Sequence, residues 1–310
     1  MSKLNIVMDI SQYDTFRMCE RKYRNRYRHN LHPLENAKPL DRGTLVHLAC
    51  ETYYGDLQRG VHFNDAVQHA LSAVRTAGID TDLEVDEILR VIEVMEEYFD
   101  HWRVADQAFQ IVEVEKPIMY LLHEAEDWKF YLSGKIDLII SDNRYTNLPI
   151  DHKSYDRSYP TSRMPNQFKN YVNALQSNFL VVNKIGFQKT VPVHEKMIRV
   201  PLSFDPLYLD TWKQNVIKVI EWYVHCLATD YWPTNETSCD KFNRKCEYLE
   251  VCDSSGEEAA DFKMMTMFKK GEPWDVTKVL KKTSEQVKEE AKLLAASNDA
   301  SPRDATFNKG

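Results

Sequence analysis

The chain has 310 residues, of which 43% are hydrophobic and 11% aromatic, so it can bury a core and is not disordered throughout. It contains neither a run of about 18 apolar residues nor the apolar stretch of a secretory signal near its start, which argues against a membrane-spanning or secreted protein. The net charge of −7 argues against nucleic-acid binding over the whole surface, although local patches decide phosphate contacts. We therefore expect a soluble, cytoplasmic protein without membrane contact.

Helical periodicity predominates in the first hundred residues. We expect a first helix over residues 10–28, with Ser11 as its N-cap and aromatic residues repeating along one side. A loop that contains prolines follows at 29–41. Three further helices are predicted, at about 42–58, 62–77 and 83–104.

The first predicted helix carries a strongly basic segment. Residues 17–28 hold six basic residues against a single acidic one. Four arginines are spaced i, i+4, i+7 and i+11, which places them on one helix face; they are Arg17, Arg21, Arg24 and Arg28. Such a face can guide a DNA strand by phosphate contacts, or it can be an ordinary solvated surface, and both interpretations stay open.

The period of the hydrophobic pattern changes between about 108 and 154. Short segments rich in β-branched and aromatic residues alternate there with turn-forming residues, which predicts three or four adjacent strands in an antiparallel meander. A helix at about 163–184, a strand near 195–202 and a helix at 206–228 are expected to follow. This order predicts an α/β protein in which helices flank a small mixed β-sheet.

Residues 254–310 differ in composition from the rest of the chain. They contain few large apolar side chains among many Lys, Glu, Asp and Ser residues. One helix is expected near 276–296, and the last dozen residues are expected to be disordered. We therefore divide the chain into a folded domain at 1–253 and a charged C-terminal tail at 254–310.

Two carboxylates and a lysine are predicted to meet on adjacent strands. Asp151 and Lys153 lie two residues apart and share one face of a strand, and a turn brings Asp137 of the preceding strand beside them. Neighbouring carboxylates repel one another, and their burial is costly unless a cation neutralises them. A divalent metal such as Mg²⁺ or Mn²⁺ would do so, and would activate water for phosphodiester hydrolysis. The alternative is a structural ion pair at the sheet surface.

These three residues resemble the paired strands of the PD-(D/E)XK nucleases, with Asp at the second acidic position. Upstream, GTLVHLACE at 43–51 resembles the Gly-x-x-x-His helix of the RecB-like group, whose histidine is a metal ligand. The resemblance implies that His47, Asp137 and Asp151 bind the metal and that Lys153 helps to orient and activate the water. Without the resemblance, His47 would be interpreted as an ordinary helix histidine.

Downstream, Gln167 and Tyr171 resemble the Gln-x-x-x-Tyr element of the same group. They share a helix face, because residues i and i+4 are neighbours. The resemblance places them at the active site near the scissile strand; otherwise Tyr171 would belong to the core and Gln167 to the surface. It also implies that the backbone carbonyl of His152 is a further metal ligand. Glu113 and Glu115 alternate in the preceding strand, where related nucleases sometimes have an acidic residue.

The chain has six cysteines and no export signal, so disulfides are not expected. Cys50 and Cys226 lie in apolar-periodic segments and are interpreted as plain buried thiols. The other four form a set of the size that a [4Fe–4S] cluster or a structural zinc ion requires; they are Cys19, Cys239, Cys246 and Cys252. Zinc sites usually contain a closely spaced C-x(2–4)-C pair, which this chain lacks.

The split between one early cysteine and three late ones resembles the AddB-type and CRISPR-associated iron–sulfur nucleases. Residues 11–27 and 232–252 resemble the segments that bear the cluster in that group. The departure is the x6 spacing between Cys239 and Cys246, where better-known members have x2; phage-encoded relatives allow the longer insertion. The resemblance implies a [4Fe–4S] cluster that closes the helical N-terminal part of the nuclease. Zinc and four free thiols are the alternatives.

The motifs and their order predict a metal-dependent DNA nuclease, and the resemblance favours an exonuclease in recombination, repair or phage DNA replication. The expected cofactors are a [4Fe–4S] cluster and Mg²⁺ or Mn²⁺. The expected partners are DNA, as single strands or duplex ends, and a helicase or recombination protein. The alternatives are a non-catalytic DNA-binding or assembly protein that keeps the nuclease fold, and a zinc-stabilised regulatory protein.

Overall fold

The computed structural model describes residues 3–34, 38–81, 83–156, 162, 164–241, 244–273 and 275–276. The chain forms two compact units. The first unit is built from Met1–Glu35, Pro117–Gly134 and Thr211–Gly310, and the second from Asn36–Lys116 and Lys135–Asp210. Within the described residues, no helix combines the length and the apolarity that crossing a membrane requires.

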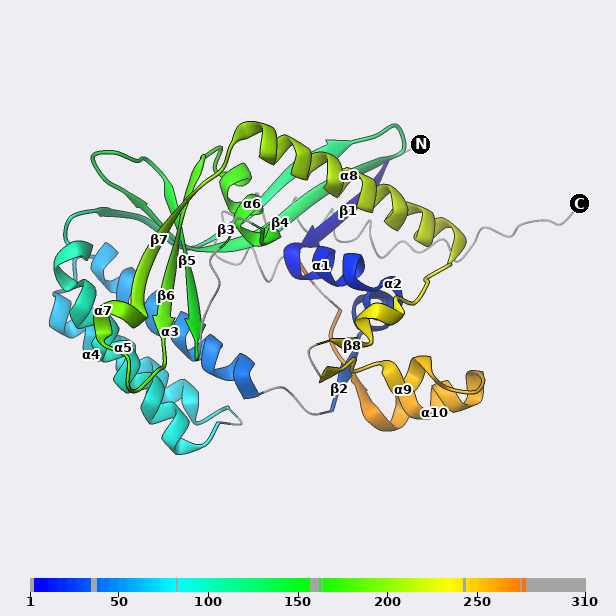
Figure 1. Ribbon diagram of the computed structural model, residues 1–310, viewed down its shortest axis with the longest axis horizontal. Coiled ribbons are helices and arrows are strands. Elements are labelled where there is room, and N and C mark those ends of the chain that lie inside the picture. Colours follow the sequence, from blue (N-terminus) through cyan, green and yellow to red (C-terminus); the bar gives the residue numbers. More distant parts are fainter. Residues whose placement is uncertain are drawn as a thin grey trace, which may run out of the picture. The chain divides into compact units, whose positions relative to one another are not determined.

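Three helices cover the strands of the second unit. They are α3 (Lys38–Gln58), α4 (Phe63–Gly78) and α5 (Val85–Asp106), which confirms the three helices predicted in this part of the chain. Figure 1 shows them packed together beside the strands β5 (Leu148–Tyr155), β6 (Phe179–Gly186) and β7 (Met197–Ser203). Buried residues such as Val91, Met95 and Phe99 repeat at helical spacing, so one face of α5 enters the core.

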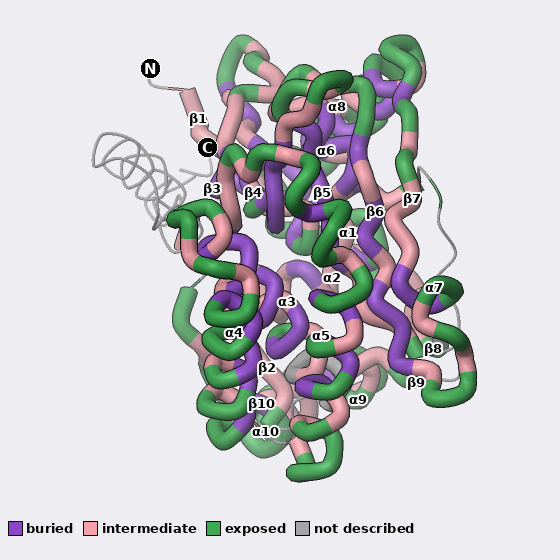
Figure 2. Tube along the Cα trace, turned by 90° about the vertical axis from the view of Figure 1, so that its left-hand side faces the viewer, coloured by how far each residue is buried: buried purple, intermediate pink, exposed green. Residues whose placement is uncertain are grey.

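The strands form a mixed sheet, as the sequence predicted. β4 (Trp128–Ser141) pairs antiparallel with β5, β5 pairs parallel with β6, and β6 pairs antiparallel with β7. β3 (Gln110–Glu124) pairs with β4, and both strands run from one unit into the other. The expected meander ends at β5, because the chain crosses through a helix before it returns as β6. Figure 2 shows how much of β5 and β6 is buried.

The helix predicted at 163–184 was wrong in its second half. The structure has α6 (Asn166–Ala174), a turn and then β6. Gln176 adopts a left-handed φ of +50°, and the Ser177 N–H donates to the Val172 carbonyl at 2.8 Å. This is a Schellman ending, which usually has glycine at the left-handed position. Because glutamine occupies it here, the sequence carried no stop signal for the helix.

The beginning of the chain also differs from the prediction. β1 (Leu4–Asp9), which the sequence analysis did not identify, pairs parallel with the first half of β4. The expected helix at 10–28 is divided into α1 (Ile10–Met18), α2 (Glu20–Tyr23) and the π-helical turn η1 (Arg24–Arg28). Cys19 is extended between α1 and α2, with φ −165° and ψ 117°. Asp9 rather than Ser11 is the N-cap, because its carboxylate accepts from the Gln12 N–H at 2.8 Å.

The first unit has an aromatic core of its own. The ring of Phe16 meets Tyr23 and Tyr223 edge-on, with centroids 5.5 and 5.2 Å apart, and Trp232 stacks on Tyr23 at 6.1 Å. Tyr223 belongs to α8 (Pro206–Thr229), which confirms the last predicted helix of the folded part. These contacts fix α1 and α2 against residues more than two hundred positions later.

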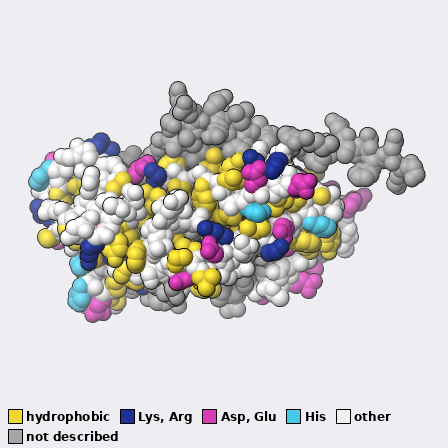
Figure 3. Space-filling view, turned by 90° about the horizontal axis from the view of Figure 1, so that it is seen from above, with side chains coloured by type: hydrophobic (Ala, Val, Ile, Leu, Met, Phe, Trp, Pro, Cys, Tyr) yellow, Lys and Arg dark blue, Asp and Glu magenta, His cyan; other side chains and the backbone are white. Residues whose placement is uncertain are grey.

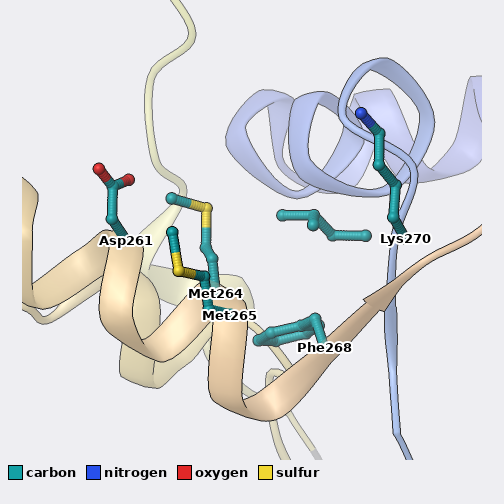
Figure 4. Close-up of a pocket in the computed structure, with 6 residues that line it drawn as sticks. Asp261, Met264, Met265, Phe268 and Lys270 are labelled. Carbon is teal, nitrogen blue, oxygen red and sulfur yellow. The ribbon is translucent and has the colours of Figure 1, made fainter.

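A smaller hydrophobic cluster lies among the last described residues of the first unit. Tyr248 stacks on Phe268 at a centroid distance of 5.0 Å, and β10 (Phe268–Lys270) pairs with β2 (Leu31–Pro33). Leu31, Met264 and Phe268 line an apolar pocket beside this pair of strands (Figure 4). The remaining short elements are α7 (Val193–Lys196), η2 (Glu236–Ser238), β8 (Asp240–Lys241), β9 (Arg244–Lys245), α9 (Leu249–Cys252) and α10 (Glu257–Met267).

The helix predicted near 276–296 and the expected disordered end lie outside the described residues. The division of the chain at residue 253 stays a prediction.

Candidate active site

A histidine and two carboxylates come together in the second unit, from α3, β3 and β4. Ligand atoms of His47, Glu115 and Asp137 all lie within 4.8 Å of one another, the one such compact group among the described residues. His47 Nδ1 is 3.4 Å from Asp137 Oδ1, and Asp137 Oδ2 accepts from the backbone N–H of His152 at 2.8 Å. The buried Asp137 carboxylate is thus held from both sides. The sequence had predicted His47 and Asp137 together, and the structure places them together.

Glu115 owes its place in this group to a distorted strand. In a regular strand Glu113 and Glu115 would point to the same side, as their alternation suggested. Glu115 instead has a left-handed φ of +54°, a kink that re-aims a strand side chain. Glu113 pairs with Lys116 near the surface, whereas the buried Glu115 carboxylate pairs with Lys135 Nζ. Glu115 could not be assigned a role from the sequence, because no sequence signal marks this kink.

Asp151 and Lys153 point to the same side of β5, as their spacing predicted. Lys153 Nζ lies 2.7 and 2.9 Å from the two oxygens of the fully buried Asp151 carboxylate. Burial raises the pKa of Asp151; Lys153 opposes this effect, and the Asp137 carboxylate adds to it. For Asp137 the effect of burial is outweighed by His47 and by the His152 N–H, so its pKa is lowered. The Asp151 carboxyl therefore binds a proton more tightly than an ordinary aspartate, and the Asp137 carboxyl binds one less tightly.

Gln167 and Tyr171 connect Lys153 to the backbone of β4. Lys153 Nζ donates to Gln167 Oε1 at 3.1 Å, and Gln167 Nε2 donates to the Tyr171 hydroxyl at 2.7 Å. That hydroxyl in turn donates to the carbonyl of Lys135 at 2.5 Å. The structure thus brings both residues to the site, where their contacts are with Lys153 and with each other. This chain of bonds fixes the direction of the Lys153 ammonium group.

The imidazole of His152 lies on the opposite side of β5 from Asp151 and Lys153, because strand side chains alternate. It stacks on the ring of Tyr54, with centroids 5.7 Å apart and 5° between the planes. Complete burial lowers the pKa of His152 to about 3, so the ring is neutral near pH 7. Its backbone N–H reaches Asp137, and the predicted use of its carbonyl as a metal ligand stays a prediction.

The donor set at His47, Glu115 and Asp137 fits a hard divalent cation. Carboxylate oxygens suit Mg²⁺, and Mn²⁺ also accepts an imidazole nitrogen. Burial lowers the pKa of His47, but the hydrogen bond with the Asp137 carboxylate and the negative charges of Asp137 and Asp151 together raise it above its ordinary value. The same carboxylate that retains a proton on His47 would retain a cation in its place.

The predicted arginine face is divided, because the helix that was to carry it is interrupted. Arg21 donates to the Trp232 carbonyl at 2.8 Å, and Arg24 pairs with Asp230 at 2.9 Å. Arg17 and Arg28, by contrast, are exposed. On the face of the molecule seen in Figure 3, basic and acidic side chains lie beside one another in small groups.

All six cysteines are free thiols, and Cys50 and Cys226 are buried as predicted. The other four belong to the first unit and are close enough to interact electrostatically. Burial raises the pKa of Cys252; Arg21 opposes this, and the thiols of Cys19, Cys246 and Cys239 add to it.

The four thiols form no compact group in the part of the chain that the structure describes. Among the described residues, no three of them lie within 4.8 Å of one another. The shared site predicted for these four cysteines stays a prediction.

Comparison with known proteins gives an extensive match to a protein family. The family model of the PD-(D/E)XK nuclease superfamily matches residues 9–253, which include every site residue named above. A probable serine/threonine-protein kinase of Dictyostelium discoideum is 23% identical over 134 residues, 41% of this chain and 21% of the kinase, so the chain spans about a fifth of that protein. A solved structure, the crystal structure of SSO0001, is 11% identical, with 57% of this chain and 72% of that chain covered and a TM-score of 0.27.

The burial of Asp151 generates a stability prediction. Lys153→Met in metal-free protein should lower the free energy of unfolding by about 3 kcal/mol at pH 8, because it leaves a buried carboxylate without its partner. The loss should shrink toward pH 5. Without Lys153, the pKa of the Asp151 carboxyl in the folded variant rises further above its unfolded value of about 3.9. The free energy of unfolding of the variant therefore falls as the pH increases from the unfolded pKa to the folded pKa.

Urea denaturation in EDTA at both pH values measures this loss. The matched control is Lys116→Met, whose partner Glu113 is 41% exposed and whose removal should change stability by less than about 1 kcal/mol. Equal losses in the two variants, or a loss at Lys153 that ignores pH, would contradict the role given to this pair.

Proposed function

Because the chain belongs to the PD-(D/E)XK nuclease superfamily, we propose that it hydrolyses DNA phosphodiester bonds with the help of Mg²⁺ or Mn²⁺. The observation that carries this proposal is the compact group of His47, Glu115 and Asp137 in the same unit as the buried Asp151–Lys153 pair. A cation bound there supplies Lewis acidity and a water molecule of lowered pKa. Asp151 and the carbonyl of His152 are the further ligands that the resemblance implies.

The chain's own residues divide the remaining work. Lys153, held between Asp151 and Gln167, keeps its ammonium group in one direction, where it orients a water and offsets the charge that grows on the phosphate. Gln167 and Tyr171 act through Lys153 and are positioning residues. Asp137 presents one oxygen to His47 while the His152 N–H restrains the other, so the carboxylate cannot rotate away.

We further propose exonuclease action on DNA ends in recombination, repair or phage DNA replication, with a helicase or recombination protein as partner. The support is the order of the Gly-x-x-x-His, Asp, Asp-x-Lys and Gln-x-x-x-Tyr motifs, which resembles that of the RecB-like group. A cytoplasmic location fits this assignment, since the four cysteines of the first unit must stay reduced to bind a metal.

Cleavage of a labelled oligonucleotide tests the proposed reaction. Asp151→Asn and Lys153→Ala should each lower the rate at least a hundredfold, about 2.7 kcal/mol of transition-state stabilisation, and EDTA should abolish the wild-type rate until Mg²⁺ or Mn²⁺ is added. Asp100→Asn, on the exposed side of α5, is the control and should cleave normally. Full activity in a folded Asp151→Asn protein would rule out this site, and no cleavage by the wild type would favour the non-catalytic DNA-binding alternative. Substrates labelled at the 5′ or 3′ end separate exonuclease from endonuclease action.

We propose that the exposed Arg17 and Arg28 contact DNA phosphates, while Arg21 and Arg24 hold the chain against residues 230–232. The double change Arg17→Glu, Arg28→Glu should weaken DNA binding and reduce the slope of log K against log salt by roughly two, since fewer counterions are released. Filter binding at several salt concentrations measures the slope. An unchanged slope would leave these arginines as an ordinary solvated surface.

We propose that Cys19, Cys239, Cys246 and Cys252 hold a [4Fe–4S] cluster. The support is their resemblance to the iron–sulfur nucleases and their mutual electrostatic influence. Joining Cys19 to the late group would close a loop of more than two hundred residues, which restricts the unfolded chain and stabilises the fold.

Anaerobic purification tests the cluster. The wild type should be brown and contain iron and sulfide, and Cys246→Ser should lose the colour and melt at a lower temperature. Cys226→Ser, which alters a buried thiol outside the set, is the control and should keep its iron. A colourless wild type that contains zinc would show the alternative cofactor. Loss of iron without a change in melting temperature would contradict a structural role.

A further inference from the structure

A network of buried polar side chains fills the core of the second unit on the His152 side of β5. Its members come from α3, α5, β6 and β7; they are Tyr54, Tyr98, Asp106, Asn183 and Arg199. Tyr54, Tyr98 and Asn183 have no exposed surface, and Asp106 is 5% exposed. Buried polar groups destabilise a core unless each finds a partner, so the direction of every hydrogen bond matters.

The carboxylate of Asp106 sets that direction, because it can only accept. Arg199 Nη1 lies 2.6 Å from Asp106 Oδ1, and the Tyr54 hydroxyl donates to Oδ2 at 3.1 Å. Tyr54 has then used its single hydrogen. The Tyr98 hydroxyl, 2.5 Å away, must therefore donate to Tyr54.

The hydrogen bonds continue from Tyr98 through Asn183 to His152. The Tyr98 oxygen has given its hydrogen, so it accepts, and Asn183 Nδ2 donates to it at 2.6 Å. The second hydrogen of that nitrogen faces His152 Nδ1, which lies 2.7 Å away. Nδ1 therefore accepts, and the proton of the neutral imidazole is on Nε2.

Arg199 completes the network and fixes its polarity. Its Nη2 donates to the hydroxyl oxygens of Tyr54 and Tyr98 at 2.9 and 3.2 Å, which leaves both oxygens as acceptors from this side. The guanidinium also lies over the Trp102 ring, 4.1 Å from its centroid. A network anchored by an ion pair at one end cannot reverse its hydrogen bonds without leaving Asp106 unsatisfied.

The position of His152 connects this network to the candidate metal ligands. Asn183 is the register partner of His152 across β5 and β6, and the Tyr54 ring stacks on the imidazole. The ring is therefore fixed by a hydrogen bond at its edge and by a face contact. The backbone N–H of the same residue donates to Asp137 Oδ2 at 2.8 Å. Whatever fixes the His152 ring also fixes the peptide group that orients Asp137.

We propose that Asn183 is a positioning residue of the metal site: by donating to both Tyr98 and His152 it holds His152 in the Nε2–H tautomer and keeps its peptide N–H on Asp137. This inference rests on the proposed metal-dependent function for its consequence, but not for the tautomer. Partners beyond the direct ligands orient the ligands, and their loss typically weakens metal binding about 10- to 100-fold.

The tautomer is measured by ¹⁵N NMR of histidine-labelled protein in EDTA, with the His152 signals assigned by their loss in His152→Gln. The wild type should show a protonated Nε2 and an unprotonated Nδ1. Asn183→Asp replaces a donor by an acceptor and should move the proton to Nδ1. A wild-type ring protonated at Nδ1, or an Asn183→Asp ring unchanged from the wild type, would overturn the assigned direction of the network.

Mn²⁺ affinity, measured by titration calorimetry, tests the consequence for the site. Asn183→Leu should weaken binding about tenfold or more, and Tyr98→Phe, which keeps the Asn183 contact with His152, should weaken it less. Tyr223→Phe removes a buried hydroxyl of the first unit and should bind Mn²⁺ like the wild type. If Asn183→Leu does not fold, as judged by circular dichroism, Asn183→Asp and Tyr98→Phe carry the comparison.

The outcomes separate the two proposals. Wild-type affinity in a folded Asn183→Leu protein, or in both substitute variants, would overturn the positioning role and leave the proposed nuclease function standing. A wild type that binds no Mn²⁺ and cleaves no DNA would overturn the proposed function, and with it the consequence for the metal, while the tautomer result would stand by itself.

Discussion

Three carboxylates are buried close enough to one another that each affects the proton affinity of a neighbour, and much of the second unit is arranged around this repulsion. Glu115, Asp137 and Asp151 are each 6% exposed or less. Each has a different compensating partner: Lys135 for Glu115, His47 with a backbone N–H for Asp137, and Lys153 for Asp151. Charges so placed would be expelled from an apolar core without such partners. The site therefore depends on the side chains and the backbone N–H that compensate these charges as much as on the carboxylates themselves.

The helix α3 connects the candidate metal ligands with the hydrogen-bond network. His47 and Tyr54 are seven residues apart in α3 and so lie on the same helix face. The His47 ring lies 6.2 Å from the His152 ring, and Tyr54 stacks on that ring. The helix that brings a ligand to Asp137 thereby also brings the first hydroxyl of the network behind it. A shift of α3 would disturb the ligand and its support together.

The residues that could be predicted from the sequence are those whose relations are local. Asp151 and Lys153 share a strand face, Gln167 and Tyr171 share a helix face, and in both pairs the spacing alone was sufficient. Glu115 could not be separated from Glu113, because the alternation rule assumes a regular strand and fails at a left-handed φ. The arginine face failed for a similar reason, since one extended residue divides the helix that was to carry it.

The hydrogen-bond network was beyond sequence analysis because no pattern relates its members. Tyr98 and Asp106 lie in α5 and Arg199 lies in β7. Each would be interpreted separately, as a core aromatic, a helix-end acid and a strand-surface base. Their partnership follows from the pairing of β5, β6 and β7, where His152 faces Asn183 and Asn183 faces Arg199 in register. Sequence predicted a sheet here but not this register, because the second half of the expected helix was in fact β6.

The division of the chain into two compact units separates the four cysteines from the candidate metal ligands, which their spacing in the sequence did not show. The four cysteines fall in the first unit, while the candidate ligands, Lys153 and the network that supports them fall in the second. The chain leaves the first unit after its N-terminal segment and returns to it finally through α8, so the second unit is contained in the loop between Cys19 and Cys239. A link between those cysteines would therefore restrain the ends of a loop that contains all of the proposed chemistry. It would act on stability and on the arginine-bearing segment, without any of the thiols having to belong to the set of residues that holds the divalent cation.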